Sequence, residues 1–216
     1  MKKRLLIFGG NSFLAGELNK AFSDVFEIVN IYRNERNGQP GFDFDKDDPA
    51  VFAGQASGYF DGILFFQGLN PVMSPEDITD EHFTRMLNIN LTKPCLLIRE
   101  LATKLNDGAL VLFFSSIAKK KGSYDPAYSS AKAGINGLIQ SLANFYPKFR
   151  FNLISLGLIE NSPVFNQMTA EFRQKHADRM FGNAFIQAAD VVKIVADLVT
   201  NQSINRADIS IDGGYH

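Results

Sequence analysis

The sequence predicts an α/β fold: a Rossmann-like, doubly wound parallel sheet of about seven strands with helices on both faces. Short apolar runs alternate along the chain with amphipathic stretches of helix length, which is typical of repeated βαβ units. The length of 216 residues suits one domain with a sizeable core. A glycine-containing turn follows the first apolar run. We therefore expect a single nucleotide-binding domain over residues 1–216.

The apolar runs and the stretches between them define the expected elements in order. The runs that favour strands are Arg4–Phe8, Phe26–Tyr32, Gly41–Asp45, Gly62–Gln67, Ala109–Ser115, Arg150–Leu156 and Ile209–Asp212. The stretches that favour helices are Leu14–Ser23, Thr79–Leu91, Thr92–Leu105, Tyr128–Phe145, Thr169–Arg179 and Ala189–Thr200. Between Asp48 and Asp61 the chain is short, so that crossover has room only for a very short helix or turns.

The composition excludes several classes of function. A net charge of -1, with 21% charged and 45% hydrophobic residues, gives no sign of nucleic-acid binding or disorder. The single Cys95 cannot form an intrachain disulfide or a metal cluster, which favours a reducing compartment. The apolar stretch Leu5–Phe8 is too short for a signal peptide, and no run approaches the roughly 18 apolar residues of a membrane span. We expect a soluble, cytoplasmic protein without a metal.

The first strand-to-helix turn is a candidate dinucleotide site. Its residues run Gly9-Gly10-Asn11-Ser12-Phe13-Leu14-Ala15-Gly16. Glycines permit a tight turn and close backbone approach, while a helix N-terminus offers free N–H groups to a pyrophosphate. The candidate cofactor-binding residues are therefore Gly10, Asn11, Ser12, Phe13 and Leu14. A simple strand-to-helix turn is the alternative interpretation.

The end of the second strand indicates which dinucleotide binds. It reads Ile31-Tyr32-Arg33-Asn34, without a carboxylate to bind a ribose 2′-hydroxyl. Arg33 can instead meet a 2′-phosphate. The sequence therefore favours NADP(H), with NAD(H) as the alternative, and a solvated loop charge is the other interpretation of Arg33.

Tyr128 and Lys132 form a candidate acid/base pair. Residues four apart share one helix face, so both side chains can point into one cleft. A neighbouring ammonium stabilises a phenolate and moves the tyrosine pKa toward the working pH. An amphipathic helix with a surface lysine is the alternative. The pair follows a strand that ends in Ser115-Ser116.

These pieces, in this order, resemble the short-chain dehydrogenase/reductase family in its compact single-domain branch. The family's glycine-rich turn is similar to Gly9–Gly16, with Leu14 where a middle glycine is usual. Its Asn-Asn-Ala-Gly segment is similar to Phe65-Phe66-Gln67-Gly68, of which Gly68 is kept. The ending Asp212-Gly213-Gly214 resembles the family's last strand. The resemblance extends from the first strand to the C-terminus.

The resemblance implies roles for individual residues. Ser116, Tyr128 and Lys132 would be the catalytic serine, tyrosine and lysine. The strand ending favours Ser116, whereas the family's usual spacing to the tyrosine favours Ser115. Asn90 would complete the catalytic set by holding a water in a proton relay.

Two further residues resemble cofactor contacts of the family. Ile159 falls where a backbone group meets the nicotinamide carboxamide. Asp45 resembles the acidic residue that contacts the adenine amino group, and a turn-forming aspartate is the alternative.

The implied function is transfer of hydride between NADPH and a carbonyl or alcohol substrate, with Tyr128 as proton donor or acceptor. Segment 161–185 would form a lid over a small-molecule substrate, or dock on the core, or do both. Lys119-Lys120-Lys121 could attract an anionic substrate or simply be solvated. The family resemblance also implies a homodimer or homotetramer. A non-catalytic module that senses the cofactor or another ligand is the rival hypothesis, motivated by Leu14, Phe65 and Phe66.

Overall fold

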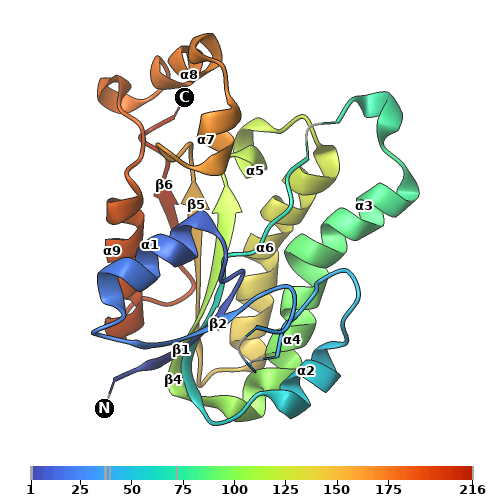
Figure 1. Cartoon of the computed structure of the whole chain (residues 1–216), viewed down its shortest axis with the longest axis vertical. Helices are drawn as coiled ribbons and strands as arrows, with labels where there is room; N and C mark the ends of the chain where they lie inside the picture. The colour runs from blue at the N-terminus through green and yellow to red at the C-terminus, as the bar shows by residue number, and fades with distance from the viewer. Residues whose placement is uncertain (1, 37, 39, 72, 216) are drawn as a thin grey trace.

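A single parallel sheet organises the protein. The computed structural model describes residues 2–36, 38, 40–71 and 73–215, so the expected domain ends at 1 and 216 lie outside these ranges. The strands are β1 Arg4–Phe8, β2 Glu27–Ile31, β3 Phe60–Phe65, β4 Leu105–Ser116, β5 Arg150–Leu156 and β6 Asp208–Ile211. Their order in the sheet is β2-β1-β3-β4-β5-β6 (Figure 1). The order reverses between β1 and β3, the place where doubly wound sheets open a ligand crevice at their carboxyl ends.

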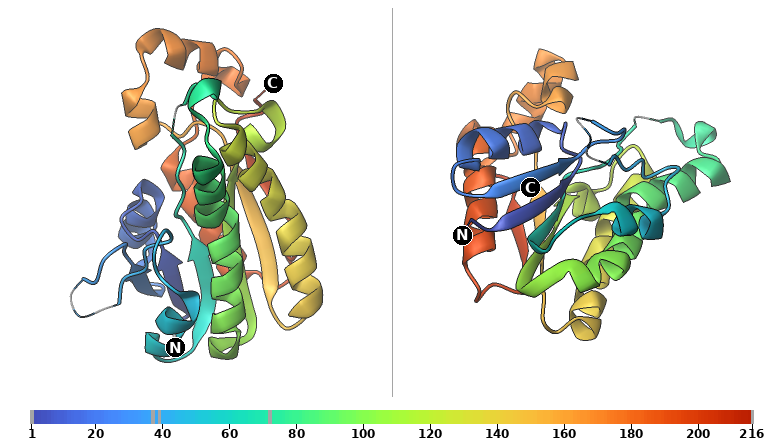
Figure 2. Two further views of the ribbon diagram at one scale, coloured as in Figure 1. Left: turned by 90° about the vertical axis from the view of Figure 1, so that its right-hand side faces the viewer. Right: turned by 60° about the horizontal axis from the view of Figure 1, so that its bottom comes forward.

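Helices cover both faces of the sheet. The longer helices are α1 Phe13–Phe22, α2 Pro49–Gln55, α3 Asp80–Leu87, α4 Lys93–Leu101, α6 Pro126–Phe145, α8 Ala170–Ala177 and α9 Ala188–Thr200. The shorter ones are η1 Pro75–Asp77, η2 Asn88–Thr92, η3 Ala102–Lys104, α5 Ala118–Lys121, α7 Pro163–Gln167 and η4 Phe181–Asn183. Figures 1 and 2 show α1 and α9 on one side of the sheet and α2, α4 and α6 on the other. The expected doubly wound α/β fold is confirmed.

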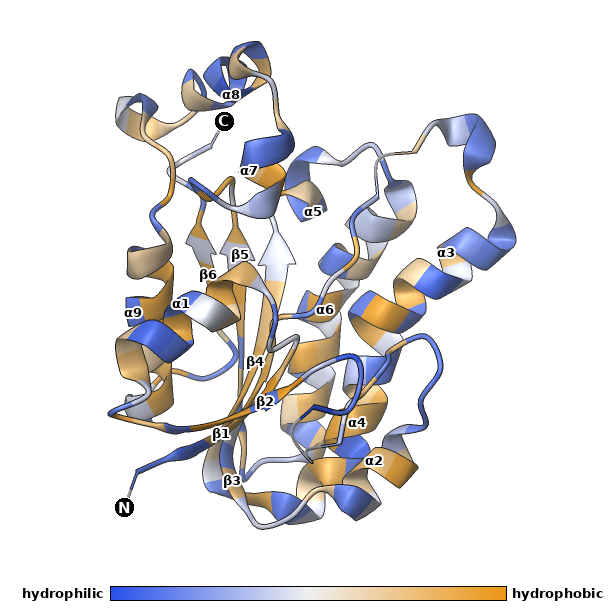
Figure 3. Ribbon diagram, viewed as in Figure 1, coloured by the Kyte–Doolittle hydropathy of each residue, from blue (hydrophilic) through white to orange (hydrophobic). Residues whose placement is uncertain are grey.

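The core lies on both sides of the central strands. Phe8, Phe65 and Phe113 occupy paired positions on β1, β3 and β4. Their rings stack with centroids 5.3 Å and 5.0 Å apart, and all three side chains are buried. Leu64 and Leu112 face the opposite layer, against α1 and α9. Figure 3 shows the hydrophobic residues concentrated on the strands and on the helix sides that face them.

The expected strand Gly41–Asp45 was wrong, and the described residues form six strands rather than about seven. Phe42 donates its backbone N–H to the Tyr32 carbonyl, but the chain then turns, since the amides of Lys46 and Asp47 donate to the Asp43 carbonyl. The alternation of Phe42 and Phe44 imitates a strand. Both rings instead pack edge-on against Phe8, so aromatic packing explains the pattern.

Several boundaries also differ from the expected ones. The helix expected over Thr79–Leu91 is α-helical only to Leu87 and continues as the π-helical turn η2. The helix expected from Tyr128 begins at Pro126, because Asp125 caps it. The short crossover between Asp48 and Asp61 carries the short helix α2, as expected.

The stacked phenylalanines lead to a stability prediction. Phe65→Ala should lower the free energy of unfolding by about 3–5 kcal/mol, because it leaves a cavity between two buried rings. Phe145→Ala, at a side chain that is 79% exposed, should change it by less than about 0.5 kcal/mol. Urea denaturation of both variants measures the difference, and similar values for the two would contradict the assignment of the core.

Candidate active site

The C-terminal end of β4 holds the helix that carries Tyr128 and Lys132. Lys132 Nζ donates a hydrogen bond of 2.8 Å to the Phe114 carbonyl. In return, Ser115 Oγ donates to the Lys132 carbonyl at 2.9 Å. Lys132 is only 5% exposed, and its burial lowers the pKa of the ammonium to about 8. One turn of α6 is thus fixed on the strand end by two reciprocal hydrogen bonds.

Tyr128 lies one turn earlier on the same face of α6 and is 9% exposed. The centre of its ring is 5.7 Å from Lys132 Nζ. Burial raises the pKa of the Tyr128 phenol, and the neighbouring Ser116 hydroxyl opposes that rise. The two serines therefore differ in surroundings: Ser115 binds the backbone of α6, whereas Ser116 is the serine beside the phenol.

Asn90 and Gly68 lie beside Lys132. Asn90 is 1% exposed, sits in the π-helical turn η2, and donates through Nδ2 to the Met86 and Leu69 carbonyls at 3.1 Å and 3.3 Å. Its Oδ1 is buried without a hydrogen-bond partner among the described residues. A Cβ built on Gly68 would lie 3.4 Å from this oxygen and 3.6 Å from Lys132 Nζ. The structure thus brings Gly68, Asn90 and Lys132 together.

The glycine turn is closed to larger side chains at two positions. Gly9 has φ +79°, and a Cβ there would lie 2.7 Å from the Gln67 amide nitrogen. A Cβ on Gly10 would lie 2.7 Å from the Cβ of Asn30. The backbone therefore passes tightly between the ends of β2 and β3, so these two positions have room only for glycine.

The side chains of the remaining turn residues differ in their exposure to solvent. Asn11 is exposed, and Ser12 caps α1 by accepting a 3.2 Å hydrogen bond from the Ala15 amide. Phe13 is half-buried. Leu14 is buried in the core cluster that contains Ile7, so its side chain is directed away from the turn surface.

The expected adenine end contains two carboxylates with different partners. Asp45 forms a two-pronged ion pair with Arg85 of α3, at 3.0 Å and 2.8 Å, and this pair lowers the pKa of Asp45. Asp43 instead lies 3.9 Å from Nε of Arg33, whose side chain is largely exposed. Sequence reasoning missed Asp43. The available signal was its position between Phe42 and Phe44, because a carboxylate there avoids the core that both rings enter.

A second cation near the end of β2 was also missed. The guanidinium of Arg36 lies over the Tyr32 ring, 4.9 Å from its centre. Arg33 and Arg36 are both exposed. This end of the sheet therefore presents two exposed guanidinium groups, one of them close to the Asp43 carboxylate.

The chain beyond β5 provides the other wall of the crevice. Ile159 is buried and pairs with Ile186 in a parallel bridge, through the Leu158 carbonyl and the Glu160 amide. By alternation, the backbone groups of Ile159 itself face away from Ile186. In Figure 1, α7 and α8 lie beyond the carboxyl ends of the strands.

The expected lid segment both docks and exposes apolar side chains. Phe165 and Met180 are buried, whereas Phe181 is 89% exposed. Lys119 in α5 is not a free rim charge, because its side chain is buried in an ion pair with Asp208 and donates to Ser155 Oγ at 2.7 Å. Lys121 lies over the Tyr215 ring.

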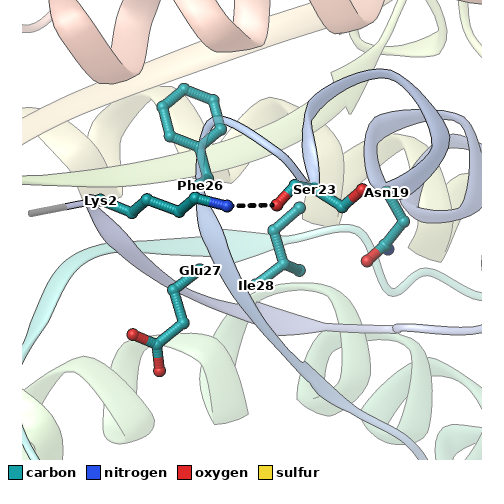
Figure 4. Close-up of a pocket in the computed structure, with 6 residues that line it drawn as sticks. All are labelled: Lys2, Asn19, Ser23, Phe26, Glu27 and Ile28. Carbon is teal, nitrogen blue, oxygen red and sulfur yellow. Dashed lines mark hydrogen bonds between the residues drawn. The ribbon is translucent and has the colours of Figure 1, made fainter.

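A hollow at the other end of the sheet does not coincide with these residues. It has a volume of about 580 Å³ and is lined by Lys2, Asn19, Ser23, Phe26, Glu27 and Ile28 (Figure 4). Lys2 Nζ donates across it to the Ser23 carbonyl at 3.2 Å. Glu27 begins β2, so this hollow is at the amino ends of the strands, opposite the edge where Ser116 ends β4. The candidate site is instead at the carboxyl ends of the strands, where Tyr128 lies beside Ser116.

The sheet order and the crevice place the protein among the Rossmann-type α/β proteins. The model of the family described as enoyl-(acyl carrier protein) reductase matches residues 50–216, which is more than half of the chain. The protein belongs to the short-chain dehydrogenase/reductase family, as the sequence indicated.

Curated relatives are similar over most of the chain. An uncharacterised short-chain type dehydrogenase/reductase of Sinorhizobium fredii is 28% identical over 156 residues, which cover 68% of this chain and 62% of that protein. A short chain dehydrogenase of Penicillium rubens is 28% identical over 178 residues, covering 73% and 69%. The match to the first of these relatives thus spans less than two thirds of its length.

Solved structures share the fold at low identity. A protein of Thermus thermophilus has a TM-score of 0.88 with 21% identity, covering 99% of this chain and 98% of that one. A short chain dehydrogenase family protein of Francisella tularensis has a TM-score of 0.86 with 20% identity, covering 100% and 99%. A small-chain dehydrogenase in complex with NADPH has a TM-score of 0.84 with 20% identity, covering 99% and 98%. Among the described residues, no helix combines the length and apolarity needed to cross a bilayer.

The buried ammonium of Lys132 leads to a pH prediction. Its pKa falls from 10.5 to about 8 on folding, so between these values the unfolded chain binds more protons and stability rises with pH. The shift corresponds to a gain of about 3 kcal/mol across that window. Lys132→Met should lack this gain.

Urea denaturation of the wild type and Lys132→Met, from about pH 7 to about pH 11, measures the effect as the difference between the two curves. Other titrating groups contribute to both proteins and largely cancel in the difference. Parallel curves would contradict a buried ammonium at this position.

Proposed function

We propose that the protein is an NADP(H)-dependent oxidoreductase that transfers hydride between its cofactor and a carbonyl or alcohol group of a small molecule. The observation that carries the proposal is the convergence of Ser116, Tyr128, Lys132 and Asn90 at the carboxyl ends of the strands. Family membership supports it, since these residues match the catalytic positions that the resemblance implies.

The residues along the crevice fit a nicotinamide dinucleotide. Two observations carry this fit: the closed backbone turn at Gly9, and the buried Asn90 Oδ1 near Lys132, which has no hydrogen-bond partner among the described residues. The groups that would hold the cofactor are the turn residues Gly10–Leu14 for the pyrophosphate, Arg33 for the 2′-phosphate, Asp43 or Asp45 for the adenine, Lys132 for the nicotinamide ribose, Ile159 for the carboxamide, and Gly68 for close packing. The similar dehydrogenase in complex with NADPH supports the choice of cofactor.

When bound, the cofactor supplies or accepts the hydride. The chain's own groups handle the proton. In the reducing direction, Tyr128 Oη gives its proton to the substrate oxygen while Ser116 Oγ donates a hydrogen bond to the same oxygen. Since burial raises the pKa of Tyr128, its phenol keeps that proton at neutral pH until it is needed. The Lys132 ammonium then offsets the charge on the phenolate.

Asn90 completes the proton path. Its Nδ2 is committed to two backbone carbonyls, which fixes the direction of Oδ1. Oδ1 can accept a hydrogen bond from a water that links Lys132 to solvent. The π-helical turn gives this residue its inward orientation, and such turns are frequent at functional sites.

The departures from the family pattern are compatible with an enzyme. Leu14 is buried in the core, and Phe66 stacks on Phe114 with centroids 4.3 Å apart. Phe65 belongs to the central aromatic stack. These apolar residues pack the interior and do not fill the crevice, which weakens the motivation for the non-catalytic alternative.

We place the protein in the cytoplasm as a homodimer or homotetramer, as the resemblance implies.

Tyr128→Phe tests the proton donor. The variant should lose at least about 100-fold in kcat, because no other hydroxyl replaces the donated proton, and its Kd for NADPH should stay within about twofold. Tyr124→Phe, at an exposed tyrosine near the start of the same helix, is the matched control. Steady-state reduction of a panel of carbonyl compounds and a binding titration give the two quantities. Full activity in Tyr128→Phe would rule out the assigned role.

Arg33→Ala tests the choice of cofactor. Loss of one charge contact with a 2′-phosphate should weaken NADPH binding about tenfold and leave NADH binding unchanged. Lys20→Ala removes an exposed charge on α1 and should change neither. Fluorescence titration of both dinucleotides provides the readout, and an equal loss for NADPH and NADH would contradict a 2′-phosphate contact.

A further inference from the structure

The helices α3 and α6 meet along one face of each. On the segment from α3 into η2, His82, Met86 and Asn90 recur at intervals of four and therefore share a side. On α6 and its cap, Asp125, Tyr128 and Lys132 also share a side. These two sides carry the residues of the candidate site.

Each of the three residues on the first side lies close to one residue on the second side. His82 Nε2 lies 2.9 Å from Asp125 Oδ2. Met86, which is fully buried, packs in one small cluster with Tyr128. In the third pair, Asn90 Oδ1 and Lys132 Nζ flank Gly68. His82 and Asp125 therefore form the polar end of the contact between the two helices. The proposed catalytic residues lie further along the same contact.

Asp125 is directly connected to Tyr128. It is 0% exposed, and its Oδ1 accepts from the backbone amides of Ala127 and Tyr128 at 2.8 Å and 3.2 Å. Its other oxygen is committed to His82. Since a carboxylate only accepts hydrogen bonds, Nε2 of His82 carries the proton in this pair. The carboxylate thus joins the first turn of α6 to α3.

We propose that His82 and Asp125 are positioning residues for Tyr128, which fix the rotation of the first turn of α6 and so the place of the phenol beside Ser116. This inference rests on the function proposed above. A helix cap alone needs only the contacts of Oδ1 with the free amides. The His82 contact adds a polar link to α3, so its loss leaves α6 capped and leaves only apolar packing between its first turn and α3.

Because the helix cap and the His82 contact use different oxygens of Asp125, variants of His82 test the positioning of Tyr128 without removing the cap. His82→Leu removes the donor. His82→Gln keeps one, because the glutamine amide nitrogen can reach the place of Nε2. Glu81→Gln, at an exposed neighbour on α3, is the control. Should His82→Leu fail to fold, His82→Asn, which is too short to reach Asp125, takes its place.

The first readout does not depend on turnover. With 3-fluorotyrosine incorporated at position 128, the ¹⁹F resonance reports the surroundings of the ring. We expect it to shift and broaden in His82→Leu and to match the wild type in His82→Gln and Glu81→Gln. An unchanged resonance in His82→Leu would overturn the proposal.

The second readout separates positioning from general damage. With a carbonyl compound that the wild type reduces, kcat of His82→Leu should fall about 10- to 100-fold through misplacement of the donor. The Kd for NADPH should remain within about twofold, and His82→Gln should recover most of kcat. Equal loss in both His82 variants, or unchanged kcat in His82→Leu, would overturn the proposal. A wild type that reduces no carbonyl compound would defeat the proposed function, and the ¹⁹F resonance would still decide the positioning role.

Discussion

The hydrogen bond from the buried Lys132 ammonium to the Phe114 carbonyl is the contact on which the site depends. It fixes α6 at the end of β4, and this sets where Tyr128 lies relative to Ser116. Burying an ammonium is unfavourable, as its lowered pKa of about 8 records. A helix could dock on a strand with apolar contacts alone. A charged group kept at this point is better explained by a chemical role than by stability.

The sheet supplies the second constraint. Phe8, Phe65 and Phe113 are aligned in register across three strands, so the strands end at one edge. The glycine turn follows β1, Gly68 follows β3, and Ser116 ends β4. Parallel pairing of the strands therefore brings to a common edge residues that are far apart in the sequence, and the stacked rings pack on one face of the same strands.

Local patterns predicted what depends on local spacing. The sequence indicated the alternation of strands and helices, the Gly9-Gly10 turn and the Tyr128–Lys132 pair. Each of these follows from the spacing of residues that are close together in the sequence. The assignment of Gly41–Asp45 failed, since alternating phenylalanines look the same whether they pair in a sheet or pack in a turn. The Asp45–Arg85 and His82–Asp125 contacts join residues 40 and 43 positions apart. No local signal indicates which distant partner a carboxylate meets.

We propose that the crevice holds a nicotinamide dinucleotide, and equilibrium titration of the purified wild-type protein with NADPH and with NADH tests this most directly. We expect saturable binding of one NADPH per chain, with weaker binding of NADH. Absence of saturable binding for both dinucleotides would contradict it, and the chain would then be a member of its family without the family's cofactor chemistry.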